Sequence, residues 1–88
     1  MIKKLNAHPY AQANIIIRDN YVALVSYNTT VAICENGWLT VYGLYSATTR
    51  KHIGAFMREM GYGDYYTAKR IFGMGVRYNV ETGEIENL

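Results

Sequence analysis

The pattern of apolar and polar residues changes once along the chain, from strand-like runs to helical spacing at Ser46. Before this point, β-branched and aromatic residues form short runs separated by turn residues, which is typical of a β-meander. Four strands are predicted, at residues 14–18, 21–27, 30–35 and 38–42. Asn36–Gly37 is the clearest turn, because both residues tolerate the positive φ of a two-residue type I′ hairpin. Asp19–Asn20 and Asn28–Thr29 are the other two turn signals.

Beyond Ser46 the apolar residues recur with a helical period, at Thr49, Ile53, Phe56, Met57 and Met60. Ser46 is a good N-cap and Gly61 a good C-terminal stop for this helix. A second helix is predicted over residues 65–72, with Asp64 as its cap and Gly73 as its stop. Residues 76–80 and 84–86 predict a last strand or hairpin. The expected fold class is therefore α+β: an antiparallel meander of about four strands, two short helices and a C-terminal strand, in one domain over residues 1–88.

Extending the hairpin pairing through the earlier turns predicts that both faces of the sheet are apolar. One face would carry Ile16, Ala23, Val25, Ala32, Cys34, Leu39 and Val41. The other would carry Ile15, Ile17, Val22, Leu24, Val31, Ile33, Trp38 and Tyr42. Since two helices cover one face only, the second face needs cover from the chain's own ends, from a second copy in a homodimer, or from a partner. A one-residue slip at Asn28–Thr29 would change this assignment.

Composition narrows the setting of the protein. The 88 residues are half apolar, which supports one hydrophobic core. Cys34 is the single cysteine, so no intrachain disulfide can form and a reducing compartment is expected. No apolar run reaches the roughly 20 residues of a membrane span, and the N-terminus lacks the apolar run of a signal peptide. We therefore expect a cytoplasmic protein without a membrane partner.

Nine tyrosines are the most unusual feature of the composition. Tyrosine is enriched in protein interfaces, because it brings a large apolar area with a polar tip. The predicted partner-binding residues are Trp38, Tyr42, Tyr45, Tyr62, Tyr65 and Tyr66.

Basic residues concentrate in the helical half, although the net charge is only +2. Hydroxyls and bases follow one another at the predicted helix start, where free backbone N–H groups favour anions. The predicted contacts for an anion or a nucleic acid are Ser46, Thr48, Thr49, Arg50, Lys51, Arg58, Lys69 and Arg70. The alternative interpretation is an ordinary capped helix start followed by solvated helix faces.

Catalytic motifs are not predicted. His8, Cys34 and His52 have no metal-ligand spacing, and the glycines at 61–63 and 73–75 bracket a helix instead of forming a phosphate loop. Cys34 with His52 is the one candidate nucleophile–base pair, whereas a buried, inert thiol is the expected state of a cysteine in mid-strand. We expect no enzyme activity, no cofactor and no metal.

Two segments carry a family resemblance: Ser26-Tyr27-Asn28-Thr29-Thr30-Val31-Ala32, and Tyr45-Ser46-Ala47-Thr48-Thr49-Arg50-Lys51-His52-Ile53 with Phe56. Together they resemble a pattern in short uncharacterised proteins of phages and mobile elements of low-GC Gram-positive bacteria. The resemblance covers roughly residues 26–61 and implies no catalytic role. It implies a small phage or mobile-element protein, a class in which inhibitors of host defence, including anti-CRISPR proteins, are common.

The sequence therefore leaves two functions open. The first is a non-enzymatic protein that binds a host protein, such as a defence nuclease that it inhibits. The alternative is a small nucleic-acid-binding protein that uses its basic helical half, with tyrosines to stack on bases.

Overall fold

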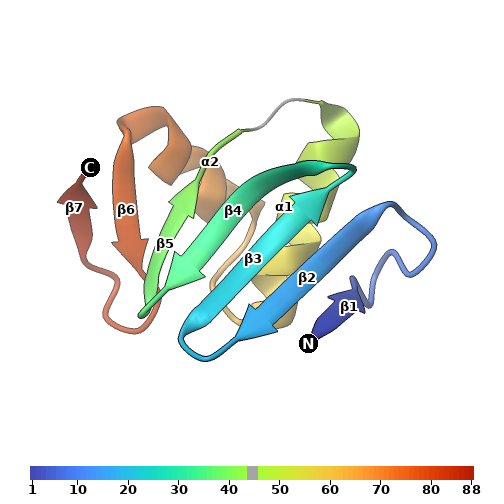
Figure 1. Cartoon of the computed structure of the whole chain (residues 1–88). Helices are drawn as coiled ribbons and strands as arrows, with labels where there is room; N and C mark the ends of the chain where they lie inside the picture. The colour runs from blue at the N-terminus through green and yellow to red at the C-terminus, as the bar shows by residue number, and fades with distance from the viewer. Residues whose placement is uncertain (44–45) are drawn as a thin grey trace.

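A single antiparallel sheet with two helices on one face makes up the computed structural model, which describes residues 1–43 and 46–88 (Figure 1). The expected α+β class is confirmed, but the sheet has seven strands, where about four were predicted. They are β1 (Ile2–Lys4), β2 (Ala13–Arg18), β3 (Tyr21–Ser26), β4 (Thr29–Glu35), β5 (Trp38–Val41), β6 (Val76–Asn79) and β7 (Ile85–Asn87). Their order in the sheet is their order in the sequence.

The additional strands lie at the two edges of the sheet. At one edge, β1 pairs with β2 so that Ile2 lies opposite Ile16. This strand has three residues and gives no periodic signal, which is why the sequence did not predict it. At the other edge, β6 and β7 form a hairpin where the sequence predicted a last strand or hairpin, and in it Tyr78 pairs with Ile85.

The hairpin at Asn36–Gly37 has the predicted register. Asn36 has φ 53° and Gly37 has φ 85°, as a type I′ turn requires. Cys34 pairs with Leu39, and Ile33 pairs with Thr40.

The turn between β3 and β4 lies one residue earlier than predicted, at Tyr27–Asn28, where Ser26 pairs with Thr29. Tyr27 adopts φ 57°, a backbone conformation that bulky residues rarely take. A register shift between Leu24 and Val25 follows, so that Leu24 pairs with Ala32 and the face assignment from the sequence is wrong.

One face of the sheet packs against the hydrophobic core, and we call it the core face. Its residues come from both of the sets that the sequence assigned to opposite faces. Pairing places Ile15, Ile17, Val22, Leu24, Ala32, Cys34, Leu39 and Val41 on it. The other face carries Ile2, Ile16, Ala23, Val25, Ile33, Trp38 and Thr40. We call this second set the open face, because both helices lie behind the sheet, on its other side (Figure 1).

Two helices cover the core face. Helix α1 (Ala47–Met60) begins after Ser46, whose hydroxyl accepts a hydrogen bond from the Thr49 N–H at 3.1 Å, and ends at Gly61 with φ 76°. Both ends were predicted. The α1 residues Ile53, Phe56 and Met57 are fully buried against the sheet. Burial of such side chains contributes about 1.5–3 kcal/mol each.

Helix α2 (Tyr65–Met74) begins at the predicted cap but is longer than expected. Asp64 and Thr67 form a capping box, in which the Thr67 N–H donates to Asp64 Oδ1 at 3.0 Å. The helix continues through Gly73 and ends at Gly75, which has φ 64°. A glycine inside a helix costs about 1 kcal/mol, which packing of Ala68 and Ile71 in the core offsets.

Candidate basic pocket

The surface of α1 that does not face the sheet carries a row of basic residues. Ala47, Arg50, Lys51, Gly54 and Arg58 lie at positions i, i+3, i+4, i+7 and i+11 of this helix. Such spacing places them along one stripe of the helix surface. The predicted bases Arg50, Lys51 and Arg58 are therefore brought together.

This stripe forms one wall of a pocket of about 410 Å³, which we call the basic pocket. Tyr65 from the first turn of α2 and His8 from the N-terminal segment complete its lining. Its volume lies within the range of small-ligand sites, about 300–1,000 Å³. The basic pocket is thus built from two consecutive helices and from an N-terminal segment that is far from them in the sequence.

Gly54 lets α1 and α2 approach closely beside the pocket. A Cβ atom at this position would lie 3.3 Å from Tyr65 Cβ and 3.5 Å from Arg58 Nη1. The absence of a side chain at Gly54 therefore permits Tyr65 and Arg58 to come together.

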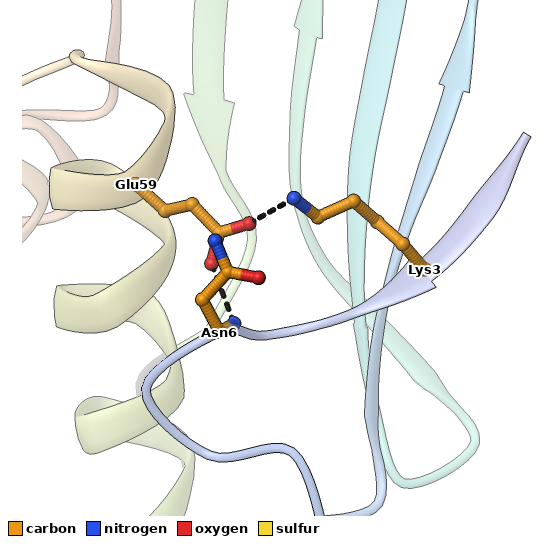
Figure 2. Close-up of polar contacts among 3 residues, drawn as sticks. All are labelled: Lys3, Asn6 and Glu59. Atoms are coloured by element: carbon orange, nitrogen blue, oxygen red, sulfur yellow. Dashed lines mark hydrogen bonds and ion pairs between the residues drawn. The ribbon is translucent and has the colours of Figure 1, made fainter.

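The N-terminal segment that supplies His8 is tied to α1 by Glu59, as Figure 2 shows. The Glu59 carboxylate forms an ion pair with Lys3 and accepts a hydrogen bond from the Asn6 N–H at 2.8 Å. Burial of Glu59 opposes ionisation, but Lys3 and the Asn6 N–H outweigh it and lower the carboxyl pKa. Leu5, which is fully buried, anchors the same segment in the core.

The charge of the basic pocket is not neutralised by neighbouring carboxylates. Two ion pairs form among the described residues, Lys3–Glu59 and Arg77–Glu86, and neither includes a base of the pocket. None of the described residues that line the pocket is acidic. Three basic side chains on one concave surface attract an anion, and arginine is suited to phosphate because its guanidinium binds two oxygens at once.

The other predicted anion contacts lie elsewhere. Ser46 and Thr49 are engaged in capping α1, with 3.2 Å between their hydroxyl oxygens, and Thr48 is exposed. Lys69 is exposed on α2 and does not line the basic pocket. Arg70 lines a second cavity of about 320 Å³ that also contains Asp64 and Tyr66.

The predicted partner-binding aromatics do not form one surface. Tyr65 lines the basic pocket, whereas its neighbour Tyr66 is 73% exposed and lines the second cavity. Tyr62 packs edge-on against Phe56, with 5.7 Å between ring centroids, and Tyr42 is exposed after β5. Trp38 lies on the open face beneath Arg77, and Tyr45 lies outside the described residues.

The open face is a second surface of interest, since no described helix or loop packs over it (Figure 1). Ile2, Ile16, Ala23 and Ile33 form a cross-strand row on it, in which each residue pairs with the next. Ile2 is 64% exposed, while Ile16 and Ile33 are half-buried by their neighbours. Ala23 is buried between them, so the row offers three partly or fully accessible isoleucines, and contiguous accessible apolar side chains are typical of an interaction surface.

The buried titratable groups have structural partners. His52 Nδ1 lies 2.9 Å from the Ser26 hydroxyl, and burial together with the nearby His8 lowers the His52 pKa. Burial raises the pKa of the Cys34 thiol, so this cysteine stays protonated and weakly nucleophilic. His52 thus has Ser26, and not Cys34, as its hydrogen-bond partner. Cys34 and His52 are therefore not arranged as a nucleophile and its base.

Three residues that line the pocket, His8, Ala47 and Gly54, were not assigned to a site from the sequence, and His8 is the one that lies outside α1. It lies 42 positions before Arg50 in a segment without periodicity, so only the tertiary fold brings it to the helix. In the described part of the chain, no three His, Cys, Asp or Glu side chains gather to hold a metal ion. None of the described helices has the length and apolar character needed to cross a membrane.

These features define a small α+β domain with an uncovered sheet face and a basic pocket between its helices. The chain belongs to a family of unknown function, DUF8033, whose sequence model matches residues 3–73. The matched region includes most of β1, all of β2 to β5 and α1, and most of α2, and therefore every described residue that lines the basic pocket. Comparison with curated proteins and with solved structures gave no match.

Proposed function

We propose that this domain is a non-enzymatic nucleic-acid-binding protein that holds a phosphate of its ligand in the basic pocket. The observation that carries the proposal is the un-neutralised charge of Arg50, Lys51 and Arg58 on one concave surface. Phosphate groups dominate the affinity of proteins for nucleic acids, and their contacts come mostly from arginine and lysine.

Binding of fluorescein-labelled 20-nucleotide single strands and duplexes, followed by anisotropy over a series of salt concentrations, tests this function. We expect affinity that falls as salt rises, because phosphate contacts release counterions. The double variant Arg50→Ala/Lys51→Ala should weaken binding about tenfold or more, since two phosphate contacts are removed.

The matched control is Lys69→Ala/Arg70→Ala, which removes the same charge from α2 outside the basic pocket. It should weaken binding much less. Equal losses in the two double variants would mean that the general charge of the domain binds the ligand, without a specific pocket. No binding at low salt would contradict the proposed function.

A second candidate function rests on the open face. The exposed and half-buried Ile2, Ile16 and Ile33, next to Trp38, favour a protein partner over this surface. The resemblance to short phage and mobile-element proteins would make that partner a host defence nuclease, with this chain as an anti-CRISPR-like inhibitor. A second copy of the chain is the other candidate occupant.

Light scattering over a range of protein concentrations shows whether a second copy of the chain or a different protein covers the open face. A mass that doubles with concentration supports a homodimer, and loss of the dimer in Ile33→Asp would locate it on the open face. A monomer that captures a host nuclease and relieves plasmid interference supports the inhibitor. A monomer with neither effect would remove both roles for the defences tested.

A further inference from the structure

The basic pocket is larger than a phosphate group requires, and part of its lining is apolar. Ala47, Gly54 and Tyr65 share the pocket of about 410 Å³ with the bases. A site for phosphate alone would need only the cationic part of this surface. The remaining space, next to an aromatic side chain, suits a flat ring.

From this arrangement we infer that the basic pocket takes one unpaired nucleotide, with its phosphate on Arg50, Lys51 and Arg58 and its base against Tyr65. The inference rests on the proposed function and deepens it, because it specifies single-stranded nucleic acid as the ligand. Stacking of a base on an aromatic ring is tolerant of sequence, since every base has a π-face.

The geometry of α2 holds Tyr65 in place for this role. Tyr65 is the first residue of the helix, directly after the capping box at Asp64, and it is half-buried. Its ring also packs edge-on against Tyr66, with 5.5 Å between the ring centroids. A side chain that is already ordered loses little conformational freedom when it binds a base.

A duplex cannot use the pocket in the same way. Its bases are stacked and paired inside the helix, so only its phosphates are available to the cations of the pocket. Unpaired bases can unstack from their neighbours and stack on a protein side chain instead, which is how single strands are recognised. The inference therefore predicts a preference for single strands over duplexes of the same length.

The decisive measurement uses the wild-type protein with three ligands of 12 residues: oligo(dT), a duplex, and a single strand whose sugars carry no bases. The abasic strand keeps the phosphates and removes every ring. We expect it to bind roughly tenfold more weakly than oligo(dT), in line with the contribution of one stacked base. Equal affinity for the abasic strand and oligo(dT), or a duplex that binds as tightly as oligo(dT), would overturn the inference.

Variants of the ring provide an independent test. Tyr65→Leu should weaken oligo(dT) binding roughly tenfold and leave duplex binding unchanged, whereas Tyr65→Phe keeps the ring and should bind as wild type does. Tyr21→Leu is the matched control, because Tyr21 is half-buried like Tyr65 but lines another cavity, and it should bind oligo(dT) as wild type does. If Tyr65→Leu binds oligo(dT) as wild type does while Arg50→Ala/Lys51→Ala does not, the base site is wrong and the proposed function stands. If the wild type binds none of the three ligands, both are wrong.

Discussion

The Ser26 hydroxyl and the Nδ1 atom of His52 lie 2.9 Å apart in the core, where each residue is only 3% exposed. The pair connects β3 to α1 under a sheet that is otherwise apolar on this side. His8 and Tyr27 lie next to His52, with ring centroids 6.0 and 6.2 Å away. A buried histidine in such surroundings is held neutral, because burial disfavours its charged form.

Stability should therefore depend on the titration of His52. Its pKa in the folded state lies below the ordinary value of 6.5, because of burial and the nearby His8. As the pH falls below about 6.5, the unfolded chain takes up a proton that the folded state does not bind, so the free energy of unfolding decreases until the folded pKa is passed. Urea denaturation between pH 8 and pH 5 measures this decrease.

The control for that experiment is His52→Asn, which keeps a polar partner for Ser26 but cannot titrate. Its free energy of unfolding should change less over the same pH range than that of the wild type. Equal pH dependence in both proteins would show that another group is responsible.

The second prediction concerns the contacts by which Glu59 holds the N-terminal segment against α1. Glu59→Gln removes the charge that Lys3 and the Asn6 N–H stabilise. It should lower the free energy of unfolding by roughly 1–2 kcal/mol, and not by more, because solvent around the one-third exposed Lys3 screens the ion pair. Since the Glu59 pKa is lowered, its contribution is present above the ordinary value of 4.5 and is lost as the pH falls further.

Urea unfolding at pH 7 and pH 3.5 tests the Glu59 prediction, with exposed Glu35→Gln as control. The difference between wild type and Glu59→Gln should shrink at the lower pH. A cost for Glu59→Gln no larger than for Glu35→Gln would contradict the prediction.

How much of the fold was predictable depends on whether its signals are local. The Asn36–Gly37 turn was readable, because two adjacent residues determine its backbone conformation and hence the register of β4 and β5. The Tyr27–Asn28 turn was not, because tyrosine gives no local preference for φ 57°. The bulge between Leu24 and Val25 reverses the side to which the β4 residues point relative to β3, so this one extra residue, and not the earlier turn, changed the face assignment.

The same distinction applies to the candidate site. Arg50, Lys51 and Arg58 follow from the helical period, since one helix places them on one stripe. Tyr65 and His8 join them only because Gly54 admits α2 and Glu59 holds the N-terminal segment. These tertiary contacts have no signature in local sequence spacing.

The N-cap of α1 makes a third prediction. Ser46→Ala removes the acceptor for the Thr49 N–H and should cost about 0.5–2 kcal/mol. Thr48→Ala, an exposed position in the same turn, is the control and should change stability by less than about 0.5 kcal/mol. Thermal melts of both variants measure the difference, and equal melting temperatures would mean that Ser46 does not cap the helix in solution.

Neighbouring isoleucines on β2 provide a fourth prediction, which tests the two faces of the sheet. Ile15 is fully buried on the core face, where it pairs with Leu24, whereas Ile16 is half-buried on the open face, where it pairs with Ala23. Ile15→Ala should cost about 2–5 kcal/mol, because it leaves a cavity in a packed core. Ile16→Ala should cost clearly less, because solvent can fill the space that it leaves.

Urea unfolding of both variants at several protein concentrations measures the two costs. Similar costs at every concentration would mean that the face assignment is wrong, whereas a cost for Ile16→Ala that grows with concentration would mean that a second copy covers the open face, because association then contributes to stability.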